Sequence, residues 1–363
     1  MTVANKPRVL TGDTPTGRLH LGHYVGSLEN RVSMQDDYEC FFILANVHAM
    51  TTRVNAHAST KAVNDTPGIR SDTIEIVKDY VAAGIDPGRS SIFLQSEVPA
   101  IAELTWFFAM LLGYGRLMKN PTIKDEIRVK NLGDNYSFGF LLYPVGQMAD
   151  ILAFRPQWVP VGEDQVPHIE MTREIARRFN QVFCGVSGKT KDEDYESKGG
   201  VFPIPQAKVG RIARLTGTDG TNKMSKSLNN AIMLSDTPKQ VQKKCNKIYT
   251  GRVDPDSPGV VEGNTVFEYQ EIFNPDKARV EELKALYTAG EIGDGQVKKE
   301  LAEAINAFLD PMRERRAAVS DDDVIDILRQ GSARANEVAE ATLWEAKKAM
   351  NYDFFPRDLS FSD

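Results

Sequence analysis

The feature that most constrains the fold is an apolar run from Tyr38 to Ala45. A strand that is apolar along its whole length is typical of a parallel sheet covered on both faces. Strand patterns also occur at Arg8–Thr11 and Ser91–Gln95, and helix patterns at Leu19–Asn30 and Ser71–Ala83 separate the three strands. This alternation predicts an α/β fold with a parallel sheet. Ligands of such sheets bind at the carboxyl ends of the strands, so we expect chemistry in the turn after the first strand.

The pattern continues toward the middle of the chain and then becomes helical only. Helices are predicted at Ala102–Leu112, Ser137–Leu152 and Val166–Val182, a short strand at Val159–Val161, and an exposed loop at Gly185–Gly200, which is charged and glycine-rich. A capping residue followed by proline, in Asp236-Thr237-Pro238, indicates a helix start. Two later segments keep one apolar face over several turns: Val297, Leu301, Ile305, Phe308 and Met312, and then Ala335, Val338, Ala339, Thr342, Ala346 and Met350.

Composition narrows the class of protein. The 363 residues, 41% of them hydrophobic, suffice for two domains, and no apolar run approaches the ~20 residues of a membrane helix. Met1–Pro7 lacks the apolar core of a secretory signal. Three scattered cysteines, Cys40, Cys184 and Cys245, predict reduced thiols in a cytoplasm and no structural zinc site.

The charge of the chain does not exclude a nucleic acid as a partner. The net charge of −6 disfavours a protein that coats nucleic acid nonspecifically, but a local basic face can act within an acidic whole. Basic clusters occur at Lys239, Lys243, Lys244 and Lys247, and at Arg313, Arg315 and Arg316. Taken alone, each cluster is interpreted as a solvated helix face.

Two histidines occupy the turn after the first strand, within Pro15–His23 (PTGRLHLGH). The turn leads into a helix, whose N-terminal N–H groups favour phosphate. His20 and His23, three residues apart, share a helix face and can donate hydrogen bonds to developing charge, while Gly22 leaves the backbone open to an adenosine. The alternative is two surface histidines, yet two of only five histidines in the chain lie here. The motif therefore predicts ATP chemistry without fixing the substrate.

A second motif, Lys223–Ser227 (KMSKS), lies in the polar stretch Thr216–Asn230. A mobile loop with two lysines can close over a triphosphate and neutralise the leaving pyrophosphate. A solvated surface loop is the alternative, but the motif follows the histidine turn in the order that a shared nucleotide site requires, at the end of the α/β half.

HLGH followed by KMSKS resembles the HIGH and KMSKS pair of class I aminoacyl-tRNA synthetases, and the sequence between them is similar to the bacterial tryptophanyl enzymes. The resemblance covers essentially the whole chain and is carried by Pro15–Gly26, Val47–Thr51, Tyr143–Val145, Ala149–Leu152, Val159–Gln165, His168, Glu170 and Ala335–Ala339. It implies activation of L-tryptophan by ATP to tryptophanyl-AMP, followed by transfer to tRNA(Trp). No covalent enzyme intermediate is needed, so catalysis is positioning and charge stabilisation.

The resemblance also implies roles for individual residues. His20, His23, Lys223 and Lys226 would carry the charge in catalysis, and Mg²⁺ would accompany ATP without protein ligands. The ATP-binding set is Thr14, Pro15, Thr16, Gly22, His23, Gly162, Glu163, Asp164, Lys223, Met224, Ser225, Lys226 and Ser227. The tryptophan-binding set is Leu10, His48, Tyr143, Gln147, Asp150, Val159, Val161 and Gln165. Asp150 stands at the family's acceptor position for the indole N–H; a helix-surface aspartate is the alternative, against which its apolar neighbours argue.

Three segments differ from the sequence that is common in the bacterial enzymes of this family. Gln147 stands where an apolar residue is usual, and a glutamine in this helix is also similar to the tyrosyl enzymes. The loop Gly185–Gly200 looks longer than usual, and Met118–Lys124 differs in wording. A tyrosyl enzyme and a synthetase paralogue acting as a binding or regulatory partner are therefore kept as alternatives. A small-molecule adenylyltransferase would share the histidine turn but not KMSKS or the helical half.

The expected organisation has three parts. Residues 1–234 would form a Rossmann-type catalytic domain with an insertion at about 102–158, residues 235–332 an all-α anticodon-binding domain, and residues 333–363 a C-terminal helix packed back on the catalytic domain. The family resemblance implies a homodimer in the cytoplasm, with no membrane partner.

Overall fold

A five-stranded parallel sheet forms the centre of the computed structural model, which describes residues 6–55, 63–129, 136–209, 215–252, 254, 257–357 and 359. The order across the sheet is β5 (Ser90–Leu94), β2 (Glu39–Leu44), β1 (Arg8–Asp13), β6 (Trp158–Val161) and β7 (Gln206–Val209). The four predicted strands and the parallel sheet are confirmed. The fifth strand, β7, was not predicted, because its four residues at the sheet edge are all at least partly exposed and carry little apolar pattern.

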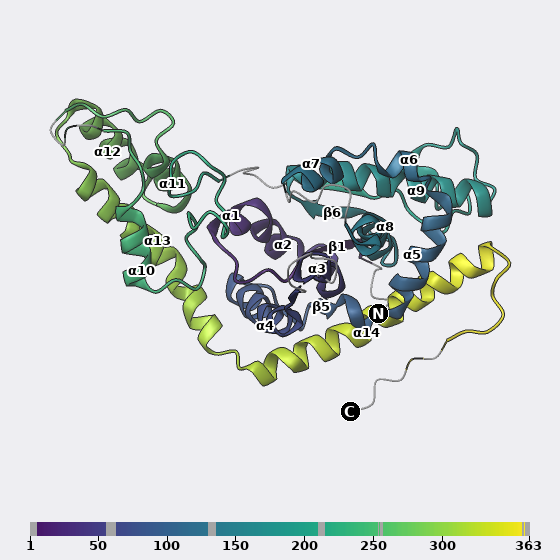
Figure 1. Ribbon diagram of the computed structural model, residues 1–363. Helices are drawn as coiled ribbons and strands as arrows, with labels where there is room; N and C mark the ends of the chain where they lie inside the picture. Colours follow the sequence, from purple (N-terminus) through teal and green to yellow (C-terminus); the bar gives the residue numbers. More distant parts are fainter. Residues whose placement is uncertain are drawn as a thin grey trace.

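Helices cover both faces of the sheet (Figure 1). Those of the α/β half are α1 (Leu21–His23), α2 (Glu29–Met34), α3 (Asn46–Arg53), α4 (Thr66–Ala83), α5 (Pro99–Leu111), α6 (Tyr114–Leu117), α7 (Pro121–Val129), α8 (Phe138–Leu152) and α9 (Val166–Phe183). Short elements are a π-helical turn, Tyr24–Leu28, the 3-10 turns Gln95–Glu97, Glu163–Gln165 and Asp192–Asp194, and the pair β3 (Val54–Asn55) and β4 (Val63–Asn64). The helix expected at Leu19–Asn30 thus begins at Leu21, contains the π-helical turn and ends at Met34.

After Leu234 the regular elements of the described residues are all helices: α10 (Pro238–Asn246), α11 (Thr265–Phe273), α12 (Lys277–Ala289), α13 (Asp294–Ala317) and α14 (Asp321–Ala349). Thr237 caps α10 as predicted, accepting a hydrogen bond from the Gln240 N–H. Figure 1 shows α10–α13 grouped at one end of the molecule and α14 returning along the sheet. None of the helices in the described part of the chain is long and apolar enough to cross a membrane.

Two cores result from the alternation of side chains along the strands. Phe42 and Leu44 pack on one face with α4 and with α10–α13, whereas Phe41 and Ile43 pack on the other face with α5, α8, α9 and α14. The helical half therefore shares a core with the sheet. The division proposed at residue 332 falls inside α14, which is one continuous helix from Asp321.

The loop predicted at Gly185–Gly200 is only partly exposed. Val186 and Tyr195 are buried, and Asp192 accepts hydrogen bonds from Arg173 and Arg177 of α9. The prediction of an exposed loop was wrong at these positions, because two apolar anchors and a paired carboxylate hold the loop against α9.

Helix α14 covers the edge strand β5, which would otherwise present unpaired backbone groups. Ser332 accepts a hydrogen bond from the Leu94 N–H, and Asn336 donates to the Glu97 carbonyl oxygen. Gly331 makes this approach possible, because a Cβ there would lie 1.9 Å from the Ile92 carbonyl oxygen.

We predict that Gly331→Ala lowers the free energy of unfolding by about 1–3 kcal/mol through overpacking against β5. Gly295→Ala is the control, because Gly295 is a helical glycine of α13 with open space around it. Urea denaturation of both variants checks this. Equal stability of the two variants would contradict the close approach of α14 to the sheet.

Candidate active site

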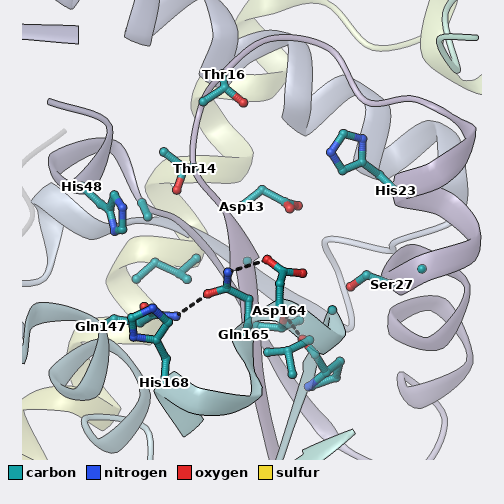
Figure 2. A pocket seen from close by; sticks show the side chains of 18 of the residues that line it. Asp13, Thr14, Thr16, His23, Ser27, His48, Gln147, Asp164, Gln165 and His168 are labelled. Carbon is teal, nitrogen blue, oxygen red and sulfur yellow. Dashed lines mark hydrogen bonds between the residues drawn. The ribbon is translucent and has the colours of Figure 1, made fainter. Parts of the chain in front are cut away.

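A cavity of about 1000 Å³ opens at the carboxyl ends of β1 and β6. Here the strand order reverses direction, since the chain builds outward from β1 to β2 and β5 on one side and then to β6 and β7 on the other. Such a reversal is where open α/β sheets bind their ligands. Figure 2 shows side chains from the first turn, α3, α8 and the segment after β6 pointing into this space.

The cavity brings together nearly all the residues that the sequence predicted. The predicted residues that line it are Leu10, Thr14, Thr16, His20, Gly22, His23, His48, Tyr143, Gln147, Asp150, Val159, Val161, Gly162, Asp164, Gln165, Lys223, Met224, Ser225, Lys226 and Ser227. Pro15 and Glu163 do not line it: Pro15 is buried and Glu163 is exposed. Histidines and lysines two hundred positions apart thus face one space.

Backbone hydrogen bonds join the histidine turn to the segment that follows KMSKS. The Leu21 N–H donates to the Ile232 carbonyl oxygen and the Leu234 N–H to the Leu19 carbonyl oxygen, both at 2.9 Å. Lys226 Nζ donates to Thr16 Oγ1 at 3.2 Å and to the Gly17 carbonyl oxygen at 3.0 Å. Burial lowers the pKa of Lys226, although nearby carboxylates, Asp13 first, oppose the change.

The two imidazoles stack with ring centroids 3.7 Å apart. Burial lowers the pKa of His20 to about 2 and that of His23 to about 4, and the charge of Lys226 adds to both effects. Both rings are therefore neutral near pH 7. As neutral rings they can donate or accept hydrogen bonds, and the positive charge at this end of the cavity comes from the lysines.

A buried ion pair beneath the turn was not predicted. Arg31 donates to Asp13 at 2.7 Å, and the Tyr80 hydroxyl donates to the same carboxylate at 2.6 Å. Burial alone would raise the pKa of Asp13, but the charge and hydrogen bonds of Arg31 outweigh it and lower the pKa to about 2. Little in the sequence indicated this pair, because Arg31 lies one residue beyond the predicted helix Leu19–Asn30, in the part of the helix that the structure extends to Met34.

One wall of the cavity carries a chain of polar contacts (Figure 2). Gln147 donates to Gln165 at 3.3 Å, and Gln165 donates to Asp164 at 2.8 Å. The other carboxylate oxygen of Asp164 lies 3.8 Å from Lys223 Nζ. The segment after β6 therefore connects α8 with the lysine loop.

The inner end of the cavity holds a buried carboxylate among apolar and aromatic groups. Asp150 is 5% exposed, and burial raises its pKa to about 7, although a hydrogen bond from Gln95 opposes the rise. Leu10 and Val159 line the same space, and the ring of Tyr143 stacks 4.6 Å from His48. The expectation of a buried Asp150 with a partner is confirmed.

Gln95 is the partner of Asp150 and was not predicted. Its amide nitrogen lies 2.8 and 2.9 Å from the two carboxylate oxygens, and its amide oxygen accepts from the Val47 and His48 N–H groups at the start of α3. One side chain thus fixes both the acid and the helix that carries His48. Its place at the carboxyl end of the predicted strand Ser91–Gln95 was its signal in the sequence, and in the structure it directly follows β5.

The two ends of the cavity suit different chemistry. The inner end can bury a flat apolar ring and offer one acceptor to a ring N–H, because Asp150 is the carboxylate among apolar walls. The outer end offers two ammonium groups and a helix N-terminus, which suit phosphates.

Comparisons with known proteins agree with this geometry. The family model of tRNA synthetases class I (W and Y) matches residues 2–310. The tryptophan–tRNA ligases of Treponema pallidum and Clostridium longisporum are each 44% identical to the chain, over 96% of it and 98% of their own length. A solved tryptophanyl-tRNA synthetase of Campylobacter jejuni, complexed with ADP and tryptophan, aligns with TM-score 0.79 at 30% identity and covers 95% of this chain and 99% of its own.

We predict that Asp150→Asn, which mimics the protonated acid, makes the fold more stable than the wild type above pH 7. The pKa of Asp150 is raised by folding, so its ionisation destabilises the folded state as pH rises from about 4 to 7. The difference in unfolding free energy should therefore be about 1–4 kcal/mol at pH 8 and shrink toward pH 5. Urea denaturation across pH checks this, with Asp164→Asn, an exposed carboxylate of the same cavity, as control. A difference that does not change with pH would refute the raised pKa.

Proposed function

Because the chain belongs to the class I tRNA synthetases of the tryptophan and tyrosine group, we propose that it is a tryptophan–tRNA ligase. It activates L-tryptophan with ATP and transfers the product to tRNA(Trp). The observation that carries this proposal is the single cavity with a buried acceptor at its apolar end and two lysines at the other. The tyrosyl alternative is not favoured, since the full-length relatives at 42–44% identity are tryptophan–tRNA ligases.

In the proposed complex the indole occupies the inner end and its N–H donates to Asp150. A phenyl ring would leave this buried acceptor unpaired, which is a strong basis for discrimination. Tyr143 and His48 enclose the ring, and Gln95 keeps the carboxylate oriented. The Gln147–Gln165 pair lies between this pocket and the ATP end, where the α-amino and carboxylate groups would lie.

ATP occupies the outer end, with its adenosine against Gly22 and the residues after β6. The tryptophan carboxylate attacks the α-phosphate, and pyrophosphate leaves between Lys223 and Lys226. His20 and His23 donate hydrogen bonds as neutral rings. Mg²⁺ neutralises phosphate charge when bound. We expect Mg²⁺ to bind together with the phosphates of ATP rather than at a dedicated site of side chains.

The tRNA would contact the helical half. We propose that residues 235–332 of this half form the anticodon-binding domain. Lys239, Lys243 and Lys247 are exposed at four-residue spacing on and just after α10, so they share one face. Such a face can bind backbone phosphates within a protein of negative net charge. Its local charge makes it the surface that we assign to tRNA.

We also propose a homodimer in the cytoplasm. An apolar cavity of about 950 Å³ lies between α3, α5 and α8, and Trp106, Val47 and Met50 at its rim are exposed. A second copy of the chain would bury this surface. All three thiols are free, as a reducing compartment requires. A protein that remains monomeric in light scattering would contradict the dimer.

We predict that tryptophan supports pyrophosphate exchange on the order of 10³-fold better than phenylalanine or tyrosine, as kcat/KM. Gln147→Met, which restores an apolar residue, should keep tryptophan as the preferred amino acid. An amino-acid panel with both proteins checks this. Exchange with tyrosine but not tryptophan would overturn the assignment, and charging of tRNA(Trp) separates an enzyme from a paralogue that only binds.

Two further variants should separate the ends of the cavity. Asp150→Ala should raise the KM for tryptophan about 100-fold with little change in the KM for ATP. Of the two substrates, only tryptophan would contact Asp150, through its indole N–H. Lys226→Ala should slow adenylate formation about 100-fold with little change in tryptophan affinity, because its charge acts on the leaving pyrophosphate. Rapid-quench kinetics measure both. Equal effects on the two substrates would contradict these roles.

A further inference from the structure

All three arginines of the cluster at the end of α13 make hydrogen bonds within the protein. Arg313 donates to the segment just before α10, whereas Arg315 and Arg316 both donate to α4. Arg313 Nε donates to the Asp236 carbonyl oxygen at 2.8 Å and Arg315 Nε to the Ala82 carbonyl oxygen at 2.8 Å, while Arg316 binds two carboxylates of α4. The sequence interpretation of this cluster as a solvated face was wrong for Arg313 and Arg316, whose side chains are largely buried where the end of α13 packs on α4; Arg315 is exposed.

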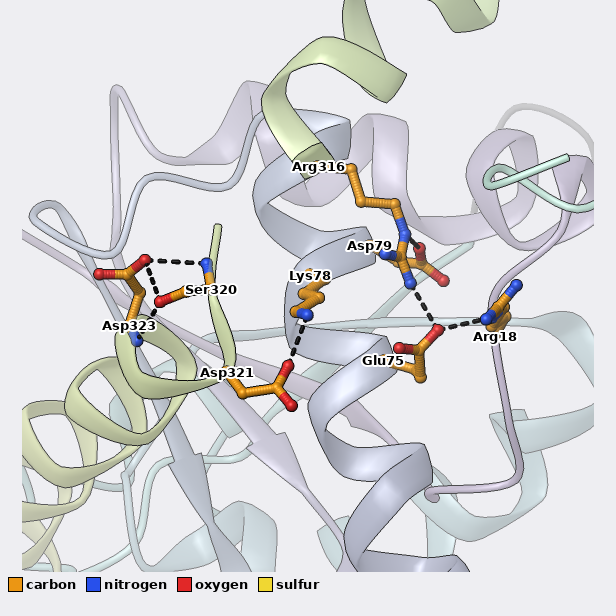
Figure 3. A network of polar contacts seen from close by, with 8 residues as sticks. All are labelled: Arg18, Glu75, Lys78, Asp79, Arg316, Ser320, Asp321 and Asp323. Carbon is orange, nitrogen blue, oxygen red and sulfur yellow. Dashed lines mark hydrogen bonds and ion pairs between the residues drawn. The ribbon is translucent and has the colours of Figure 1, made fainter. Parts of the chain in front are cut away.

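Arg316 makes the most consequential of these contacts (Figure 3). Its Nε donates to Asp79 at 2.9 Å and its Nη2 to Glu75 at 2.6 Å. Asp79 is 0% exposed, and burial raises its pKa even though Arg316 and the Leu19 N–H oppose the rise. Without Arg316 this carboxylate would be a buried charge with no cationic partner in contact, an arrangement that proteins avoid.

Both carboxylates also hold the histidine turn. The second oxygen of Asp79 accepts from the Leu19 N–H at 2.7 Å, and Glu75 accepts from Arg18 at 2.5 Å. Leu19 directly precedes His20, and its carbonyl oxygen accepts from Leu234 N–H. Two bonded steps therefore connect the end of α13 to the backbone that presents His20.

We propose that Arg316 is a positioning residue for adenylate formation: through Asp79 it holds the backbone N–H of Leu19, and through Glu75 the side chain of Arg18, so that His20 and His23 face the triphosphate. This inference rests on the proposed function for its chemistry. It makes the docking of the helical half on α4 a requirement for an ordered nucleotide turn, and Arg316 touches neither the cavity nor a substrate.

The experiment compares Arg316→Gln with Arg315→Gln. Arg315 lies on the same helical turn and bonds to α4, but it contacts neither Asp79 nor Glu75, so it controls for loosened docking. Hydrogen exchange of the segment that contains Leu19 is measured without substrate. Single-turnover adenylate formation with ATP and tryptophan is measured between pH 6 and 9.

For Arg316→Gln we expect about 10-fold faster exchange in the Leu19 segment and about 10–100-fold slower adenylate formation, with the KM for tryptophan within about twofold. Arg315→Gln should change none of these. Arg316→Lys should recover part of the rate, since it restores the charge but not the fork.

A pH signature distinguishes positioning from simple destabilisation. The groups facing Asp79 are Arg316 from α13, Glu75 on α4 with its partner Arg18, and Lys226 from the loop. Losing Arg316 removes a cation that lowers the pKa of Asp79, so in Arg316→Gln the rate should fall further as pH decreases. Adding Asp79→Asn should abolish this new dependence, because the carboxamide does not titrate.

Unchanged exchange of the Leu19 segment, or equal losses in Arg316→Gln and Arg315→Gln, would overturn the proposal. Should Arg316→Gln not fold, the comparison of Arg316→Lys with Arg315→Lys decides on the same measurements. Wild-type protein that forms no tryptophanyl adenylate would contradict the proposed function, whereas the exchange experiment needs no substrate and tests the positioning by itself.

Discussion

The structure depends on the pairing of two backbone segments that are more than two hundred residues apart. Leu19 and Leu21 exchange hydrogen bonds with Leu234 and Ile232. Two such bonds contribute only about 1–3 kcal/mol together, so burial of these four side chains in one core must supply most of the stability. The lysine loop is therefore held next to the histidine turn by this backbone pairing and by a core to which both halves contribute.

Desolvation acts in opposite senses at the two ends of the cavity, and both senses suit the proposed reaction. At the inner end it raises the pKa of Asp150, because a buried carboxylate lacks solvation. A ligand whose N–H donates to this carboxylate is therefore favoured over a ligand without such a donor. At the outer end it keeps His20 and His23 neutral, so that they add hydrogen-bond donors without repelling Lys226. In the proposed complex, burial of the two ends of one cavity would thus favour an indole N–H at the inner end and leave the positive charge at the outer end to the lysines.

Local pattern was sufficient wherever a segment's environment is uniform along its length. The strand at Glu39–Leu44 is apolar because it is buried on both faces, and the α13 stripe is apolar because one face packs on a core. The edge strand β7 was not predicted, because it is short and half exposed. The roles of three other residues were not predicted for a different reason. Asp13, Arg31 and Gln95 each bond to a partner distant in the sequence, and one sequence without homologues does not indicate which residues pair. Gln147 differs from the family pattern in the sequence, but its hydrogen bond to Gln165 is visible only in the structure.

The two basic clusters show where residue type carries information that charge counting does not. Both were interpreted alike from sequence, yet the lysines of α10 are largely exposed, whereas the arginines of α13 bond to α4 and to the start of α10. A guanidinium offers several donors in a fixed geometry and suits carboxylates and carbonyl oxygens inside a protein, while an ammonium on a flexible stem suits a solvated phosphate surface. Helices α10 and α13 pack against each other, so the surface proposed for tRNA and the contacts that hold the nucleotide turn lie on two sides of one helix pair. A displacement of α10 would therefore reach α13, where Arg313 bonds to Asp236 and Arg316 bonds to Asp79, the carboxylate that accepts from the Leu19 N–H of the histidine turn.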